Sequence, residues 1–338
     1  MEQFHTIIVG AGPGGLACAR LLAQAGIKVL VLEKKIRVGP KVCAGGITST
    51  GLVGLSLQHL VEKSFPRQYI NSKWQRISIS APVPIVSTVN RESLGQWMLE
   101  QALVAGARVL TGIRVQAVGE GQVIADSRCF GYRHLVGADG SSSLVRRFLN
   151  LKSEHMGIGI HYLVPGEFEK MEWHINADYF AQGYAWIFPH QHHASVGVYA
   201  KQGSMSGHTL IDRLKIWCRR QGIAVDNLKP TAALINFDYQ GWQFGNKWLV
   251  GDAAGLASGL TGEGIYPAIV SGEAVVISIL DDCYEADRLD RIIKKQLFHH
   301  RILALTGKGR VLSTFIMELF TLALLMKIAN FHLLEMRE

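Results

Sequence analysis

The sequence predicts an α/β protein, because three short apolar segments each run straight into a turn of glycine and an acidic residue. The first of these strand ends lies near residue 9, the second near residue 137 and the third near residue 251. The chain has 338 residues, 48% of them apolar, and 36 glycines, which is typical of a globular α/β protein with many tight turns. This length suits two closely joined domains that share one cleft.

The first strand end belongs to residues 1–33, which we expect to form a strand, a glycine turn, a helix and a second strand. The turn reads GAGPGG, in the context that a G-x-G-x-x-G dinucleotide-binding motif requires. In that motif Gly10 permits the tight turn, Gly12 admits the pyrophosphate and Gly15 lets the helix pack closely on the strand. Glu33 ends the second strand and would bind ribose hydroxyls. The motif fits NAD and FAD equally, and a βα turn without a ligand is the alternative.

The other two strand ends carry comparable turns. Residues 134–141 read HLVGADGS, and residues 248–265 read WLVGDAAGLASGLTGEGI. In the longer segment Asp252 can accept hydrogen bonds from sugar-like hydroxyls, while the glycines allow the backbone to approach a ligand closely. The helix expected to follow has Pro267 in its first turn, and its free N–H groups would face negative charge. These parts predict a cradle for a bulky polyhydroxylated anion.

The order of the three motifs resembles the fingerprints of the FAD-dependent p-hydroxybenzoate-hydroxylase-like superfamily, and the resemblance spans the whole chain. It favours FAD over NAD. Two further segments, PKVCAGGI at residues 40–47 and GYAWIFP at residues 183–189, resemble the geranylgeranyl reductase family, flavoproteins that saturate isoprenoid double bonds. The chain departs from that family at Ala181, where proline is common. This departure bears on the substrate subgroup more than on family membership.

The resemblance implies particular contacts to FAD. Arg91 opens a helix, so a guanidinium beside the pyrophosphate is chemically sensible, although an exposed arginine at a helix start would look the same. The N–H groups of Gly264 and Ile265 would stabilise the anionic reduced ring. With the dinucleotide motif included, the expected cofactor-binding residues are Gly10, Gly12, Pro13, Gly14, Gly15, Glu33, Lys34, Cys43, Ala44, Gly46, Arg91, Val115, Asp139, Gly251, Asp252, Gly264 and Ile265.

The reaction that the resemblance implies places its own demands on the site. An unactivated double bond needs a hydride from reduced FAD and a proton at its other carbon. Cys43 and Tyr184 are the candidate catalytic residues, as proton donors or, for the cysteine, as a gate; Cys43 could equally be a small buried hydrophobe. Because side chains alternate along a strand, Tyr184, Trp186 and Phe188 share one face and are expected to bind the isoprenoid chain. An aromatic core stripe would show the same pattern.

The expected architecture is an α/β protein (α+β overall) with a Rossmann-like FAD-binding domain, an antiparallel-sheet substrate domain and a helical C-terminus. The chain is expected to pass between the two domains more than once, since the FAD motifs lie on both sides of the substrate region. The expected segments are 1–68, 91–150 and 246–283 for the FAD-binding domain, 69–90 (as strands) and 151–245 for the substrate domain, and 284–338 for the helical C-terminal region.

Charge and hydropathy change towards the C-terminus. Residues 288–310 contain seven lysines and arginines against Asp290 alone, and the apolar run 311–334 follows. Glu318 and Lys327 interrupt this run, which leaves it too short to span a bilayer. A basic helix leading into an apolar helix suggests docking on anionic lipid headgroups. Packing of the apolar helix on the sheet or on a partner is the equal alternative.

The rest of the composition argues against several classes of protein. Five scattered cysteines without C-x-x-C spacing indicate a reducing cytoplasm, and we expect no signal peptide. His190, His192 and His193 have no carboxylate or cysteine at metal-ligand spacing, so we interpret them as a solvated turn without metal, and His299 as solvated in the same way. The basic segment lacks a nucleic-acid-binding motif.

The expected function is that of an FAD-dependent reductase of C=C bonds in a geranylgeranyl or polyprenyl chain. The chain would belong to a lipid, a chlorophyll precursor or a quinone, and the enzyme would be cytoplasmic with peripheral attachment to a membrane. A flavin-dependent monooxygenase or halogenase shares the three nucleotide fingerprints and is the alternative. A flavin-binding lipid sensor without turnover is a third possibility. The electron donor, NADPH or ferredoxin, stays open.

Overall fold

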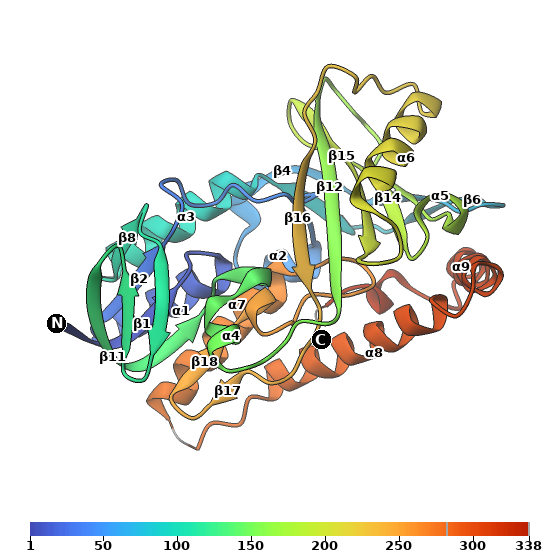
Figure 1. Cartoon of the computed structure of the whole chain (residues 1–338). Coiled ribbons are helices and arrows are strands. Elements are labelled where there is room, and N and C mark those ends of the chain that lie inside the picture. Colours follow the sequence, from blue (N-terminus) through green and yellow to red (C-terminus); the bar gives the residue numbers. More distant parts are fainter. Residues whose placement is uncertain (282, 337–338) are drawn as a thin grey trace.

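The computed structural model describes residues 1–281 and 283–336, the side chain of His332 excepted. A parallel sheet with helices on it lies beside a second, mostly antiparallel sheet, and two long C-terminal helices accompany both (Figure 1). This arrangement confirms the expected fold class.

The first sheet brings the three strand ends together. Its strand order is β17-β18-β11-β1-β2-β8, and the strands from β18 to β8 are parallel. The register places Val9 beside Gly137 and Gly137 beside Leu249, so the three glycine-acid turns share one edge. Ligands of open α/β sheets bind at this carboxyl edge. The strands are β1 (Glu2–Val9), β2 (Val29–Glu33), β8 (Arg108–Thr111), β9 (Val115–Gly119), β10 (Gln122–Ala125), β11 (Arg128–Gly137), β17 (Gln243–Phe244) and β18 (Lys247–Leu249).

Helices α1 (Pro13–Gln24), α3 (Arg91–Val104) and α7 (Ile265–Leu280) cover one face of this sheet. Two of them, α1 and α7, touch through glycine: a Cβ added at Gly272 would lie 2.3 Å from the carbonyl oxygen of Gly14. This close approach places the first turn of α1 against α7 at the ligand edge. The hairpin β9–β10 and helix α4 (Leu144–Phe148) cover the opposite face.

The second sheet has the order β16-β12-β15-β14-β13-β5-β6, and only β13 and β5 pair in parallel. Helix α6 (Gly207–Arg220) packs on one face through Leu210, Leu214 and Trp217. The strands are β5 (Arg67–Asn71), β6 (Arg76–Ser80), β12 (Met156–Pro165), β13 (Glu172–His174), β14 (Gly183–Pro189), β15 (His193–Lys201) and β16 (Thr231–Asn236). A small third sheet contains β3 (Gly46–Thr48), β4 (Val61–Phe65) and β7 (Val86–Val89), with α2 (Ser49–Gly54) after β3.

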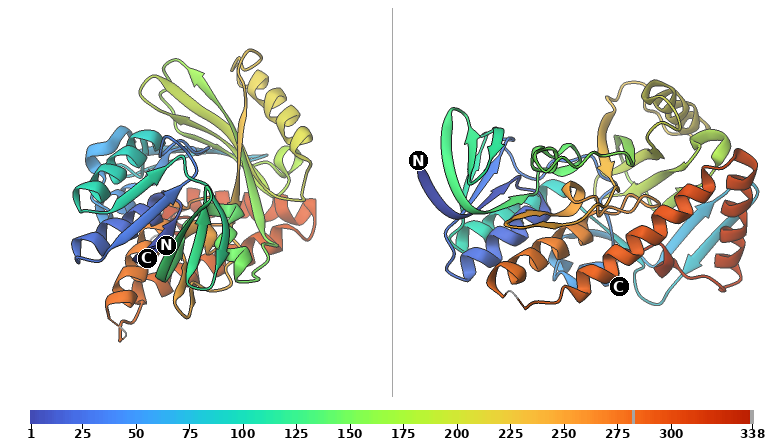
Figure 2. Two further views of the ribbon diagram at one scale, coloured as in Figure 1. Left: turned by 60° about the vertical axis from the view of Figure 1, so that its left-hand side comes forward. Right: turned by 60° about the horizontal axis from the view of Figure 1, so that its bottom comes forward.

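The C-terminal region is helical but is not one continuous apolar helix. Helix α8 (Asp287–Thr306) extends from α7 to α9, and α9 (Arg310–Leu325) crosses its far end beside β6 and the short α5 (Ala177–Phe180) (Figure 2). The apolar run 311–334 breaks where α9 ends, because Lys327 has a φ of 58° and a left-handed residue cannot continue an α-helix. No helix among residues 1–281 and 283–336 has the length and hydropathy to cross a bilayer.

Candidate active site

A cavity of about 800 Å³ lies between the carboxyl edge of the first sheet and the inner face of the second. Every residue of the predicted cofactor and substrate sets lines it, except Gly15. Gly15 lies behind the glycine turn, where an added Cβ would be 2.2 Å from the carbonyl oxygen of Gly10. The structure therefore gives Gly15 a packing role and leaves the other predicted residues around one continuous space.

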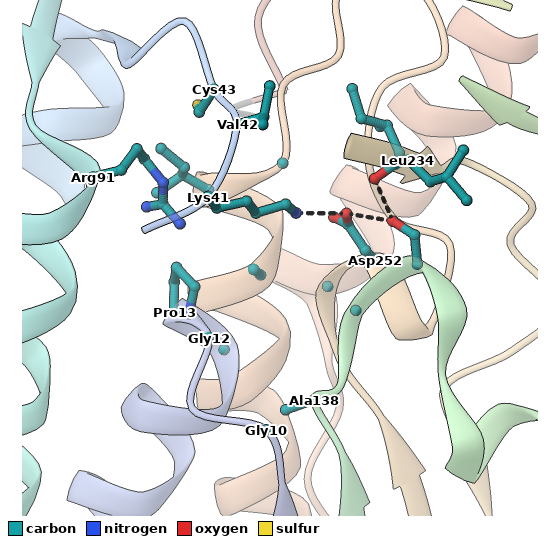
Figure 3. Close-up of a pocket in the computed structure, with 18 of the residues that line it drawn as sticks. Gly10, Gly12, Pro13, Lys41, Val42, Cys43, Arg91, Ala138, Leu234 and Asp252 are labelled. Carbon is teal, nitrogen blue, oxygen red and sulfur yellow. Dashed lines mark hydrogen bonds and ion pairs between the residues drawn. The ribbon is translucent and has the colours of Figure 1, made fainter. Parts of the chain in front are cut away.

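The glycine turn of the first motif presents backbone to this cavity. Gly10 has a φ of 103°, and an added Cβ would lie 2.4 Å from the carbonyl oxygen of Ala138, so only glycine fits there. Gly12 precedes α1 without a side-chain cap, and Pro13 is in the first turn (Figure 3). The N–H groups at this helix start are thus oriented for an anion.

Glu33 holds the end of β2 to the glycine turn. Its Oε2 accepts a hydrogen bond of 2.7 Å from the Ala11 N–H, and its Oε1 accepts one of 2.8 Å from the Lys35 N–H. A carboxylate has about four acceptor positions, so two remain for hydroxyl groups of a ligand. These two contacts fix the carboxylate at the rim of the cavity.

The two aspartates of the other turns have different surroundings. Asp139 accepts hydrogen bonds from Ser143 Oγ at 2.5 Å and from the Leu144 N–H at 2.6 Å, and burial raises its pKa. Its carboxylate therefore holds the start of α4, although the residue lines the cavity. Asp252 Oδ2 accepts hydrogen bonds from Lys41 Nζ and Ser141 Oγ, each at 2.9 Å. The Lys41 side chain reaches Asp252 across the cavity (Figure 3).

Arg91 supplies a guanidinium with two nitrogens that lack a hydrogen-bond partner among the described residues. It is the first residue of α3, after Asn90, whose side chain caps the helix by accepting hydrogen bonds from the N–H groups of Glu92 and Ser93. The guanidinium points into the cavity (Figure 3), and within the described chain its buried Nε and Nη1 have no hydrogen-bond partner. A buried unpaired charge is costly, and a bound anion would satisfy it. The donors at this end of the cavity therefore fit the pyrophosphate of FAD.

The other end of the cavity is aromatic. Tyr184, Trp186 and Phe188 of β14 share the inner face of the second sheet, opposite the face that α6 covers. The Tyr184 hydroxyl donates to the Thr261 carbonyl oxygen, and burial raises its pKa. Cys43 is half-buried beside this end, where its Sγ accepts the Gly45 N–H at 3.3 Å. The predicted catalytic and substrate residues therefore lie around the same end of the cavity.

Several cavity residues were missed from the sequence. Lys41 lies inside the PKVCAGGI segment, but its ion pair with Asp252 joins positions 211 residues apart. Trp173 lines the cavity with its ring centroid 4.7 Å from that of Phe188. Glu263 lies between two glycines of the third motif, and this position was the sequence feature that could have identified it as a cavity residue.

Glu263 is a buried carboxyl at the cavity wall. Its Oε2 accepts a hydrogen bond of 2.9 Å from the Met336 N–H. Its pKa is raised to about 7, chiefly by burial and also by the negative charge of Glu335, while the Met336 hydrogen bond and the positive charge of Lys295 act in the opposite direction. The folded protein therefore holds a proton at Glu263 that the unfolded chain releases near its ordinary pKa of 4.5.

Replacing Glu263 by glutamine is expected to flatten the pH dependence of stability. Because folding raises the pKa, the native state binds more protons than the unfolded state between the two pKa values, and stability falls as the pH rises. Between about pH 5 and about pH 8 the free energy of unfolding of the wild type falls by on the order of 2 kcal/mol for this reason, and Glu263→Gln removes this decrease. Urea unfolding at both pH values measures the free energy of unfolding, and Glu100→Gln on the exposed side of α3 is the control. Equal pH slopes for wild type and Glu263→Gln would contradict this assignment.

The interpretation of the histidine turn as solvated was wrong for His190, whereas His192 is exposed as expected and His193 is half-buried. His190 is only 4% exposed, its Nδ1 is paired with Glu62 Oε2, and its Nε2 donates to the Ala44 carbonyl oxygen at 3.0 Å. The hydrogen bond with His190 lowers the pKa of the Glu62 carboxyl. His299 is fully buried and hydrogen-bonded as well. Both histidines connect distant segments, which no local spacing reveals. The described residues contain no group of three or more side chains that could hold a metal.

Comparison with known proteins places this geometry in a family. The family of FAD binding domains matches residues 3–215, which is more than half of the chain. Digeranylgeranylglycerophospholipid reductase 2 of Methanopyrus kandleri is 30% identical, with 86% of this chain and 81% of that protein covered. Geranylgeranyl diphosphate reductase of Rhodobacter capsulatus is 26% identical, with 80% and 73% covered.

Solved structures show the same fold. A geranylgeranyl bacteriochlorophyll reductase-like protein from Thermoplasma acidophilum has a TM-score of 0.76 at 19% identity and covers 91% of this chain and 89% of its own. A probable FAD-dependent monooxygenase, pqsL of Pseudomonas aeruginosa, has a TM-score of 0.66 at 20% identity, with 93% and 99% covered. The fold and the cavity thus define an FAD-dependent oxidoreductase. Within that class, the chain belongs to the geranylgeranyl reductase family.

Proposed function

We propose that this protein reduces carbon–carbon double bonds of an isoprenoid chain carried by a lipid, a chlorophyll precursor or a quinone. The observation that carries the proposal is one cavity that contains both the anion-binding turns and the aromatic face of β14. A long apolar chain suits the aromatic end, and a dinucleotide suits the other. Two relatives named for reducing geranylgeranyl groups support the same assignment.

FAD bound in this cavity would supply a hydride from its reduced ring. In the proposal, Arg91 and the N-terminus of α1 hold the pyrophosphate, and Glu33 holds the adenosine ribose. Asp252, if released from Lys41, would accept hydrogen bonds from hydroxyl groups of the cofactor. The start of α7, which has no side-chain cap at Gly264, would offer its N–H groups to the negative charge of a reduced flavin.

The proton is assigned to Cys43 first and to Tyr184 second. The Tyr184 hydroxyl already donates to the Thr261 carbonyl oxygen, and its raised pKa makes it a weaker acid. The Cys43 sulfur accepts the Gly45 N–H, and no hydrogen bond from its thiol is found within the described part of the chain, so the thiol hydrogen can point at a substrate carbon. Trp186 and Phe188 keep water from this end of the cavity, where water would compete for the hydride.

Extraction of lipid from the purified protein tests the proposal. Mass spectra are recorded before and after anaerobic reduction with dithionite, and the expected result is a gain of two mass units for each saturated bond. Oxygen consumption coupled to NADPH, with insertion of an oxygen atom, would favour the monooxygenase alternative that shares this fold. Tight binding of FAD and lipid without turnover by NADPH, ferredoxin or dithionite would indicate a lipid sensor.

The polarity of α9 is inverted relative to an ordinary surface helix, which buries its apolar side. Glu318 on its inner side accepts hydrogen bonds from Ser72 Oγ at 2.8 Å and from the Trp74 N–H at 3.1 Å. The other buried positions are Ser313, Thr314, Thr321 and Leu324. The outer side presents a stripe of exposed apolar side chains: Val311, Phe315, Leu319, Leu322 and Met326. Such a contiguous patch marks an interaction surface.

We propose that this stripe docks the protein on an anionic lipid surface, as a peripheral protein facing a reducing cytoplasm. The exposed Arg301 and Lys308 flank the junction of α8 and α9, where they would meet negative headgroups. Trp74, 67% exposed beside α9, is the type of residue that settles at a membrane interface.

Two negative charges introduced into the apolar stripe of α9 are expected to prevent binding of the protein to anionic lipid vesicles. In Phe315→Glu/Leu319→Glu, sedimentation with vesicles that contain an anionic phospholipid should fall about tenfold or more, because apolar area no longer enters the headgroup layer. Ile216→Glu, a comparably exposed apolar position on α6, should leave sedimentation unchanged. If both variants bind vesicles like the wild type, or if the double variant instead dissociates a dimer in the absence of lipid, the stripe is not a membrane surface.

A further inference from the structure

The C-terminal tail, residues 330–336, forms part of the cavity wall. Beyond α9 the chain turns back, and Phe331 and Leu334 line the aromatic end of the cavity. Their contacts reach residues far away in the sequence, and no motif pointed to this segment. The tail therefore stands where the proposed isoprenoid chain would lie.

Hydrogen bonds tie the tail to the cofactor loop, residues 251–264. The Met336 N–H donates to Glu263 Oε2 at 2.9 Å. Independently, His299 Nε2 donates to the Leu333 carbonyl oxygen at 2.8 Å, while its Nδ1 accepts from Ser258 Oγ, also at 2.8 Å. Thr50 Oγ1 adds a third contact by donating to Glu335 Oε2 at 3.0 Å. The tail is thereby held in one position relative to the cofactor loop, α8 and α2.

Phe331 completes a group of aromatic rings around Trp173. The centroid of the Trp173 ring lies 4.7 Å from that of Phe188, 5.4 Å from that of Tyr184 and 5.9 Å from that of Phe331. Two of these rings come from β14, which was predicted to bind substrate, and one comes from the tail. An isoprenoid chain that runs along β14 therefore meets the Phe331 ring.

The exposure of the tail residues distinguishes a cavity wall from ordinary core packing. Phe331 is only partly buried, and the surface it leaves open contributes to the cavity. Leu333, in the same short helical turn, is 44% exposed and does not line the cavity. Two neighbouring apolar residues thus have different surroundings, which provides a matched pair for an experiment.

Resting on the proposed function, we infer that Phe331 ends the isoprenoid channel and determines the length of prenyl chain that fits beyond the cofactor. The Phe331 ring packs against Trp173, and the hydrogen bonds of Leu333, Glu335 and Met336 anchor the tail that carries it. Removing the ring opens space for further carbons of the chain. Enlarging it shortens the channel.

Binding of prenyl alcohols to the oxidised, FAD-loaded protein tests the inference without turnover. Geraniol, farnesol and geranylgeraniol are titrated against the visible spectrum of the flavin, and the ratio of dissociation constants for the two longer alcohols is the readout. Phe331→Ala should shift this ratio towards geranylgeraniol by about fivefold or more, and Phe331→Trp should shift it towards farnesol. Leu333→Ala should leave it unchanged.

The outcomes separate this inference from the proposed function. If the wild type binds the alcohols and its length preference persists in both folded Phe331 variants, the channel does not end at Phe331. An equal shift in Leu333→Ala would also overturn the inference, because it would reflect a general loosening of the tail. If the wild type binds none of the three alcohols, the isoprenoid function itself fails and the inference falls with it.

Discussion

Arg91→Ala is expected to raise the dissociation constant for FAD by about 30-fold. The guanidinium has two buried nitrogens without a hydrogen-bond partner among the described residues, and it points into the cavity at the start of α3. Charge-assisted hydrogen bonds to phosphate contribute roughly 1.5–3 kcal/mol, which corresponds to about ten- to a hundredfold in affinity. Titration of the apoprotein with FAD, followed by flavin fluorescence, measures the change.

The same substitution should affect the apoprotein in the opposite direction. The Arg91 side chain is half-buried, and removing its two buried nitrogens that lack a partner among the described residues relieves their desolvation cost, so the apoprotein of Arg91→Ala should unfold at the same or a higher urea concentration. Arg37→Ala is the control, since the exposed ion pair of Arg37 with Glu92, the residue after Arg91, contributes little to stability. Unchanged FAD affinity in Arg91→Ala would remove this residue from the cofactor site.

Cys43→Ala is expected to slow alkene reduction by about a hundredfold or more while the protein remains yellow. General acids contribute typically 10²- to 10⁴-fold to a rate, and the thiol is the first proton donor in the proposed mechanism. The residue also lines the cofactor cavity, so retention of FAD has to be measured in the same sample. Single-turnover reduction of a prenyl substrate by prereduced enzyme gives the rate free of the electron donor.

Two further variants separate the candidate donors. Tyr184→Phe removes a hydroxyl that is already bonded to the Thr261 carbonyl oxygen, and a small effect is expected if Cys43 is the donor. Cys129→Ala replaces a cysteine outside the cavity and should behave like the wild type. Full activity of Cys43→Ala combined with a large loss in Tyr184→Phe would transfer the role to the tyrosine.

The features predicted correctly from the sequence are those that local chemistry determines. The apolar strands with glycine at their ends are local, and the parallel register that aligns Val9, Gly137 and Leu249 follows from the fold class. The common face of Tyr184, Trp186 and Phe188 follows from the alternation of side chains along one strand. A pattern within a few residues was sufficient for each of these features.

The features that were missed depend on contacts between distant segments. Asp139 and Asp252 follow equivalent strand ends, yet one caps α4 and the other meets Lys41, because their partners come from different parts of the chain. His299 looks like a surface residue of a basic helix until Ser258 and Leu333 are placed around it. Spacing along one segment carries no information about such partners.

The parallel pairing of β5 with β13 has a consequence for synthesis of the chain. The hairpin β5–β6 leaves the ribosome early, but the neighbour that it has in the sheet among the described strands is β13, whose residue Glu172 pairs with Tyr69. Until β13 is made, the hairpin has an unpaired edge, a state in which nascent chains are prone to aggregate. The segment that contains Phe331 follows every other part of the cavity wall in the chain, so the wall that closes the flavin chamber is made after the strands and turns that it encloses.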